Sequence, residues 1–239
     1  NNQWNHWGTY HETIDLSSPG ENIRSTTANS YASWDGSSMA SPVAASVFGL
    51  LKSYNLSWDN EKVQTMVLAT ADPVIYTVNS ESYLQGMLGT GRVDAYTALT
   101  TPLFPKIEYV GEDLLSGDDN IINSGEEAEI FIILFNDPEW GLATNLHATL
   151  TENNPYVDII NSTIDYGDIS PGEAMIIEPF IVQFGTNLSN VDINFDLNIT
   201  SNESGYIEYT SIIPLSYFVE ELSVLIGDLN QDEIINILD

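Results

Sequence analysis

The chain has 239 residues, of which 35 are Asp or Glu and 5 are Lys or Arg, so its formal net charge at pH 7 is −30. Hydrophobic residues make up 43% of it, enough to form packed cores and too much for a disordered acidic tail. The acidic excess excludes a nucleic-acid binder that neutralises phosphates with basic clusters, and it argues against docking on anionic membranes. No apolar run approaches the roughly 18 residues of a membrane span. The absence of cysteine excludes disulfide scaffolds and thiolate metal sites.

The acidic charge is concentrated in the second part of the chain. All five basic residues lie within the first 106 positions, whereas residues 107–239 carry 26 acids and no Lys or Arg. Such different electrostatics predict separate folding units, and the second unit must depend on screening salt or bound cations. We therefore expect a saline or calcium-containing extracellular setting. Because the chain starts at Asn1 without a signal peptide and stops inside a patterned segment, we expect a piece of a longer secreted protein.

Residues 1–103 alternate turns with helical patterns. Residues 13–16 form a strand candidate that a Ser-Ser-Pro-Gly turn would end. The apolar run 39–51 predicts a buried helix. This helix should begin near Ser38, because Pro42 is tolerated only in a first turn.

Two further helices are predicted in the same region. One runs from about Asn60 to Ala69, with Asp59 or Asn60 as its N-terminal cap. The other is short and covers residues 93–99.

Residues 36–42 have the sequence Gly-Ser-Ser-Met-Ala-Ser-Pro. This motif resembles the serine motif of subtilisin-like proteases. Residues 14–23 are similar to the strand and glycine turn before that motif, residues 31–35 fit the approach to the serine, and residues 89–95, Gly-Thr-Gly-Arg-Val-Asp-Ala, resemble the segment that closes the catalytic domain. The resemblance implies that residues 1–103 are the C-terminal part of an α/β subtilisin-like domain, from a serine endopeptidase that acts on proteins or peptides.

The resemblance makes Ser38 the acyl nucleophile, with its backbone N–H as half of the oxyanion hole. A helix N-terminus suits this role, because its unpaired N–H groups and positive dipole favour a developing oxyanion. The alternative from the residues alone is that Ser38 merely caps a buried helix.

A nucleophilic serine needs a base and an orienting acid, which in the subtilisin order Asp, His, Ser precede it. His6 and His11 are the only histidines before Ser38. In the family they fall just before the last strand and not on the His-Gly-Thr-His helix. Since the oxyanion Asn is also expected upstream, the triad in this chain is incomplete.

The motif departs from the family at one place. Residues 42–46 are Pro-Val-Ala-Ala-Ser, where the family usually has Pro-His-Val-Ala-Gly. That histidine is not catalytic, but Ser46 in place of glycine requires more room where the helix packs. An inactive, scaffold-like relative is therefore an alternative to an active peptidase.

After Pro102 and Pro105 the hydrophobic period changes from helical to two. Residues 191–200 alternate strictly between apolar and polar, and residues 128–134 and 146–150 are further strand candidates. Their turn spacing predicts an all-β, immunoglobulin-like sandwich over residues 104–222. His147 has no Asp or Ser partner indicated nearby and is interpreted as structural.

The turn at residues 117–126 is rich in Asp and Asn. It resembles the start of β-sandwich modules appended to secreted bacterial peptidases. Its carboxylates could hold calcium, which requires six to eight oxygen ligands. A solvated turn is the interpretation we favour.

The last residues carry a calcium-loop pattern with oxygen ligands at positions 1, 3, 5, 9 and 12. These residues are Asp228, Asn230, Asp232, Asn236 and Asp239. Residues 223–239 thus resemble the start of a dockerin-type repeat, which implies a structural calcium ion and a cell-surface or cohesin-like partner. Glu233 stands where such loops usually have glycine. A calcium-dependent adhesion or surface protein is therefore a further hypothesis.

Overall fold

A computed structural model describes residues 2–201 and 208–221. It divides into two compact units, residues 1–103 and 104–239. None of the helices in the described part of the chain combines the length and apolar character that a membrane span requires.

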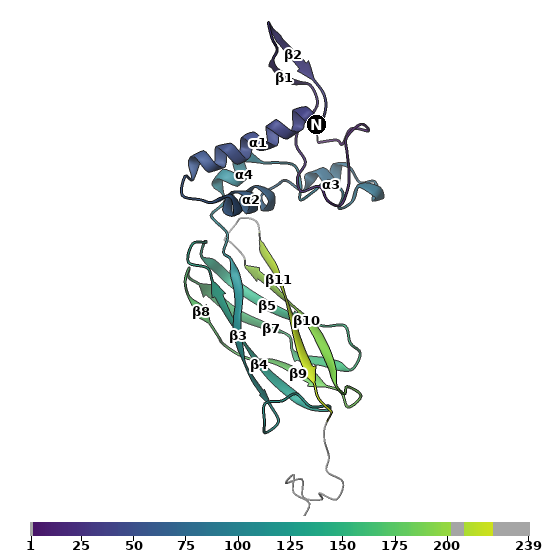
Figure 1. The fold of residues 1–239 in the computed structure, drawn as a ribbon, viewed down its shortest axis with the longest axis vertical. Coiled ribbons are helices and arrows are strands. Elements are labelled where there is room, and N and C mark those ends of the chain that lie inside the picture. The colour runs from purple at the N-terminus through teal and green to yellow at the C-terminus, as the bar shows by residue number, and fades with distance from the viewer. Residues whose placement is uncertain (1, 202–207, 222–239) are drawn as a thin grey trace, which may run out of the picture. The chain divides into compact units, whose positions relative to one another are not determined.

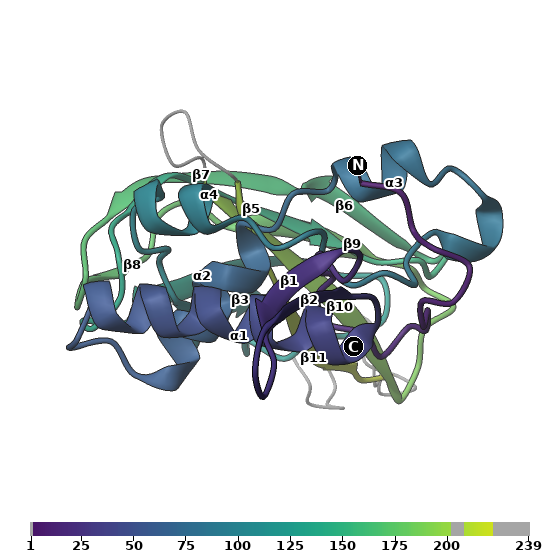
Figure 2. The same ribbon diagram turned by 90° about the horizontal axis from the view of Figure 1, so that it is seen from above.

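The first unit consists of a short hairpin and a group of helices (Figure 1). The elements in chain order are β1 (Ile23–Thr26), β2 (Tyr31–Trp34), α1 (Ser37–Tyr54), α2 (Asn60–Ala69), α3 (Val74–Val78), the 3₁₀ turn η1 (Ser82–Leu84) and α4 (Ala95–Thr100). Helix α1 packs against α2 and α4, and it runs alongside α2 in both views (Figure 2). The two-stranded sheet β1–β2 is the only sheet among the described residues of this unit.

The predicted helices are present, with small shifts at their starts, but α1 is not the buried helix expected, because only Val47 and Leu51 of its 18 residues are buried. Helix α2 has the predicted bounds, and the side chain of Asp59 accepts the backbone N–H of Lys62 at 2.9 Å. That hydrogen bond lowers the pKa of Asp59. Helix α4 starts two residues later than predicted, because Asp94 caps it by accepting the N–H groups of Tyr96 and Thr97.

Two local predictions are wrong. Pro42 is the sixth residue of α1 and so lies beyond its first turn. A residue at this position normally donates its backbone N–H to the carbonyl four residues earlier, here that of Ser38, and proline has no N–H to donate. Residues 13–16 form no strand. Their backbone groups pair singly instead, as when Thr90 donates to Asp15 at 2.9 Å, and a strand needs a continuous partner.

The second unit contains two antiparallel sheets (Figure 1). One has the order β11-β10-β5-β7 and the other the order β3-β4-β9-β6, with β8 paired to β4. The strands are β3 (Ile107–Ser116), β4 (Glu127–Asn136), β5 (Ala143–Thr151), β6 (Val157–Asn161), β7 (Thr163–Ile169), β8 (Ala174–Met175), β9 (Phe180–Phe184), β10 (Val191–Ser201) and β11 (Tyr209–Val219). The three strand candidates of this second unit are confirmed by β4, β5 and β10.

Both sheets contribute to one apolar core. Along β10 the side chains of Ile193, Phe195, Leu197 and Ile199 are buried, whereas Val191 is exposed at the strand end. These residues share a core cluster with strands of the other sheet, including Ile130, Ile132, Phe180 and Phe184. The period of two in the sequence therefore marks the face that each sheet turns to the other.

The few buried polar groups of this unit are hydrogen bonded. Asn136 is fully buried, and its amide donates to the carbonyls of Gly141 and Ile169 at 2.8 and 2.9 Å. The Tyr166 hydroxyl donates to the Ile132 carbonyl at 2.8 Å, and burial raises the pKa of Tyr166. Hydrogen bonds of this kind offset the free-energy cost of removing these polar groups from water.

Candidate active site

Ser38 lies exposed at the N-terminal end of α1. Gly36 is the residue before the helix, and its φ of 143° favours glycine. The amides of Met39 and Ala40 both donate to the Gly36 carbonyl, at 3.0 and 3.1 Å. The N–H and hydroxyl of Ser38, by contrast, have no hydrogen-bond partner among the described residues. Both groups are therefore free at the positive end of the helix dipole.

The capping role considered for Ser38 is wrong. The N-cap position belongs to Gly36, and no side chain makes a capping hydrogen bond there. A serine that caps would accept a backbone N–H two or three residues later.

A close contact with Gly20 holds the start of α1 in place. The Gly36 N–H donates to the Gly20 carbonyl at 2.8 Å. A Cβ on Gly20 would lie 2.9 Å from the Gly36 carbonyl oxygen and 3.0 Å from the Cβ of Ala40, so only glycine permits this approach. The Asp35 carboxylate also accepts the Asn22 N–H at 2.5 Å. These contacts fix the backbone immediately before Ser38.

The segment at residues 89–93 lies in close contact with two other backbone segments. A Cβ on Gly89 would lie 2.5 Å from the backbone of Asp15, and one on Gly91 would lie 2.7 Å from the Asp72 carbonyl. The Arg92 backbone N–H donates to the Asp72 carbonyl at 2.9 Å, and the Arg92 guanidinium pairs with the Asp72 carboxylate at 3.1 Å. The two glycines of the closing motif are thus required by close packing.

A cavity of about 360 Å³ adjoins Ser38. It lies between the hairpin and the first turns of α1, and its apolar lining includes Ile23, Trp34, Met39 and Val43. The hairpin that forms one side of it was not predicted, because its two strands have only four residues each and are mostly exposed, so no alternation of apolar and polar residues marks them. Ser46 also lines the cavity, exposed and donating to the Val43 carbonyl at 2.7 Å, so its side chain is accommodated without the expected crowding.

No histidine of the described residues lines this cavity. His6 is exposed, and His11 is engaged locally, with its Nδ1 2.9 Å from the hydroxyl of Thr13. The described chain therefore brings neither histidine into the lining of the cavity beside Ser38.

The neighbouring serine faces a different space. Ser37 lines a second cavity of about 720 Å³, together with Trp4, Ser18 and Arg92. Three buried polar atoms of these residues, Trp4 Nε1, Ser18 Oγ and Arg92 Nε, have no hydrogen-bond partner among the described residues. Buried polar atoms without a hydrogen-bond partner are rare in native protein structures.

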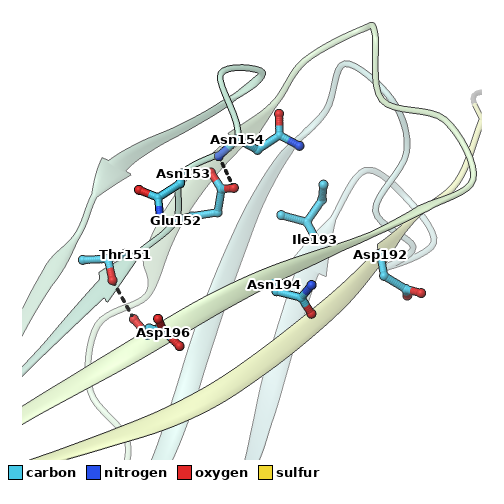
Figure 3. A pocket seen from close by; sticks show the side chains of 8 residues that line it. All are labelled: Thr151, Glu152, Asn153, Asn154, Asp192, Ile193, Asn194 and Asp196. Atoms are coloured by element: carbon cyan, nitrogen blue, oxygen red, sulfur yellow. Dashed lines mark hydrogen bonds between the residues drawn. The ribbon is translucent and has the colours of Figure 1, made fainter.

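The second unit has a polar cavity of about 360 Å³ at the ends of β5 and β10. Figure 3 shows its lining side chains, which are Thr151, Glu152, Asn153, Asn154, Asp192, Ile193, Asn194 and Asp196. Thr151 donates to the Asp196 carbonyl at 3.2 Å, and the Asn154 N–H donates to Glu152. This lining contains neither a histidine nor a nucleophile beside a base.

Within residues 2–201 and 208–221, no three His, Asp or Glu side chains are grouped so that they could hold a metal ion. In the turn at 117–126, the Glu126 carboxylate accepts from the Ser116 hydroxyl and the Asn123 N–H, at 3.2 and 3.0 Å. The predicted calcium ligands Asp228, Asn230, Asp232, Asn236 and Asp239 lie outside the described residues.

His147 has a partner that the sequence did not reveal. Its Nδ1 lies 3.7 Å from the Asp165 carboxylate, because β5 and β7 pair these two residues directly. Both side chains are exposed at the surface, and neither lines the cavity beside Ser38.

Comparison with known proteins agrees with the geometry around Ser38. Residues 1–93 match the Subtilase family. A thermostable alkaline protease from Halalkalibacterium halodurans is 37% identical over 93 residues, which cover 38% of this chain and 25% of that protein. M-protease from Shouchella clausii is 34% identical over 99 residues, covering 41% and 24%.

Bacillopeptidase F from Bacillus subtilis is 33% identical over 107 residues, covering 44% of this chain and 7% of that protein. The chain thus spans a quarter or less of these three relatives.

Proposed function

We propose that the chain is part of a secreted, subtilisin-like serine endopeptidase that cleaves peptide bonds through an acyl-enzyme at Ser38. The observation that carries this proposal is the position of Ser38, with a free hydroxyl and a free N–H at the start of an apolar helix, beside a cavity. The similarity of residues 1–93 to proteases supports it.

In the proposed reaction, the Ser38 Oγ attacks the carbonyl carbon of the substrate, and the oxygen that becomes negative accepts the Ser38 N–H. The helix dipole is already oriented before the reaction, and it stabilises this negative charge as the charge develops. The proton of the hydroxyl must pass to a base, and from the base to the leaving amine. No described residue around Ser38 offers that base, so we assign the His, the Asp and the oxyanion Asn to sequence that precedes this chain.

Two features of the first unit support packing against further polypeptide. Only Val47 and Leu51 are buried among the 18 residues of α1, although residues 39–51 of this helix are largely apolar. Helices of this kind are normally core elements. The unpartnered donors of Trp4, Ser18 and Arg92 also require acceptors, which backbone carbonyls of an additional strand would supply.

Peptide hydrolysis by the full-length protein tests the proposal. Ser38→Ala should reduce kcat by several orders of magnitude, because nucleophile and base act as a unit. Ser37→Ala is the matched control, since Ser37 lines the other cavity, and its activity should stay close to that of the parent. Equal activity of the Ser38→Ala variant and the parent would contradict the proposal.

The departure of residues 42–46 from the family pattern supports one alternative, an inactive subtilase-like scaffold. A separate alternative is a calcium-dependent adhesion or surface protein, in which residues 104–222 and the segment at 223–239 carry the function with calcium bound by the five predicted ligands. The calcium assignment is supported by the sequence pattern of residues 228–239. Retention of residues 105–222 on cell walls or carbohydrate, without hydrolysis by the full-length protein, would select the adhesion function.

A further inference from the structure

The two sheets of the second unit differ on the faces that they turn away from the core. On β10 each outward residue is polar, and these residues are Asp192, Asn194, Asp196, Asn198 and Thr200. On β4, by contrast, residues 130–135 are apolar without interruption. An uninterrupted apolar run is typical of a strand that is covered on both faces, whereas alternation is typical of a strand with one face in water. The outward face of β4 therefore indicates a partner.

The outward apolar residues of β4 are Phe131, Ile133 and Phe135, which we call the β4 stripe. Strand β4 lies between β3 and β9 in its sheet. The residues between those of the stripe, Ile132 and Leu134, are fully buried in the core cluster. The three residues of the stripe point the other way, are partly exposed and lie outside that cluster. Apolar side chains gathered in this way on a surface are typical of an interaction site.

Acidic side chains border the β4 stripe. On the neighbouring strand β3, Asp113 pairs with Phe131 and Glu108 pairs with Phe135, and both acids are exposed. Along β4 itself, Glu129 is the outward residue before Phe131. The chain has no Lys or Arg after residue 106, so these strands supply no basic side chain. The stripe thus combines an apolar surface with a negative border.

We infer that the β4 stripe binds an amphipathic helix whose apolar face is flanked by Lys or Arg. The stripe is one strand wide and about 14 Å long, because four residue steps separate Phe131 from Phe135. This length corresponds to about two and a half helical turns. Helices commonly cover apolar sheet faces, and basic residues beside the apolar face of the helix would pair with Glu108 and Asp113. Binding at this surface is independent of the peptidase function proposed above.

The negative border argues against two other occupants. A second copy of the chain, packed on the same face by two-fold symmetry, would bring the acids of both copies close together. An anionic membrane surface would meet the same repulsion. A basic helix is the occupant whose charge complements the border.

The test uses the 239-residue chain and a fluorescent peptide of Leu and Lys, about 18 residues long, in which Leu occupies one face of the helix. Binding measured by fluorescence anisotropy should be saturable. A peptide of the same composition in scrambled order has the same charge but no apolar face, and it should bind about tenfold more weakly or worse. Phe131→Ser combined with Ile133→Ser should raise the dissociation constant about tenfold or more. Phe218→Ser combined with Ile212→Ser is the matched control, because it removes the same two residue types from exposed positions of β11, and it should bind like the parent.

The negative border is tested by a second pair of variants. Glu108→Gln combined with Asp113→Asn should raise the dissociation constant about two- to fivefold, as expected for the loss of exposed ion pairs. Asp192→Asn combined with Asp196→Asn removes the same charge from β10 and should leave the dissociation constant unchanged. Equal effects of the two pairs would contradict the basic flanks assigned to the partner.

A photoreactive group on the Leu face of the peptide locates the bound peptide without any variant. Its adducts should lie in β3 or β4 of the parent chain. Absence of binding, adducts confined to other elements, or equal weakening by the Ile212 and Phe218 substitutions would overturn the inference. A dimer of the chain that dissociates when Phe131 and Ile133 are replaced would overturn it too, because a second copy would then cover the stripe.

Discussion

The two units of this protein bury their apolar residues to very different extents. In the second unit, 26 hydrophobic residues are buried in the described segments, and 24 of these form one core cluster. In residues 2–103 only 11 are buried, while Trp34, Leu50 and Leu56 are 58%, 46% and 79% exposed. The second unit thus completes its core with its own strands, whereas the first leaves large apolar side chains exposed among its described residues.

Separate expression of the two units should give the largest effect. Residues 104–239 should unfold in one cooperative thermal transition, because their core is closed. Residues 1–103 should show no cooperative transition and should bind a dye for exposed apolar surface. Circular dichroism and calorimetry on both pieces check this. A sharp transition of residues 1–103 alone would show that the exposed face of α1 needs no partner.

Truncating one large side chain in each unit tests the difference in burial between the two units. Phe195 is fully buried and makes edge-to-face contacts with Phe184 and Tyr217. Phe195→Ala should therefore lower the unfolding free energy of the second unit by about 3–5 kcal/mol. Leu50→Ala, at an exposed position of α1, should leave the helical circular dichroism signal of residues 1–103 unchanged in the absence of a partner. Chemical denaturation measures the first effect, and far-UV circular dichroism measures the second. A clear loss of helical signal in Leu50→Ala would contradict the account.

Two glycines of the first unit allow the stability cost of a steric clash to be distinguished from the cost of backbone strain. Gly86 and Gly89 have similar φ values of 74° and 79°, but a Cβ on Gly86 meets nothing within 4 Å. Gly86→Ala should cost about 1–2 kcal/mol from the left-handed backbone alone. Gly89→Ala should cost clearly more, because its Cβ would lie 2.5 Å from the backbone of Asp15. Thermal unfolding of the full-length protein compares them, and equal losses would remove the packing role of the closing motif.

Cations should have a smaller effect, confined to the second unit. Raising the salt from 0.01 to 0.1 M shortens the Debye length from about 30 to about 10 Å, so the melting temperature of residues 104–239 should rise by several degrees. Calcium should add a further increase at matched ionic strength if Asp228 and Asp232 bind it. The Asp228→Ala variant should lose that increase, whereas Asp192→Ala, in β10, should keep it. Equal melting temperatures in sodium and calcium chloride would remove the calcium site.

Sequence predicted best those elements whose signals are local. The cap at Asp59 and the strict alternation along β10 both depend on neighbouring residues, and the structure has both. The strand expected at residues 13–16 failed because its partners lie at residues 89–93, far along the chain. The pairing of His147 with Asp165 was missed for a related reason, since the register of two strands cannot be deduced from either strand alone.

The same difference between local signals and distant contacts applies to the candidate site. Ser38 and the glycines of its motif could be found from their spacing, which is local. The hairpin that closes the cavity could not, because its two four-residue strands are mostly exposed and carry no alternating pattern. Side chains that shape a cavity are fixed by packing, and packing joins residues that sequence patterns do not connect.

The most direct test of Ser38 as nucleophile is the location of a covalent adduct. A fluorophosphonate probe reacts with a serine whose hydroxyl is activated by a base, and fluoride leaves as the Oγ–P bond forms. Peptide mass spectrometry of the labelled full-length protein should place the adduct on Ser38, with labelling lost in Ser38→Ala and kept in Ser37→Ala. Labelling that persists in Ser38→Ala, or an adduct on another serine, would contradict the account.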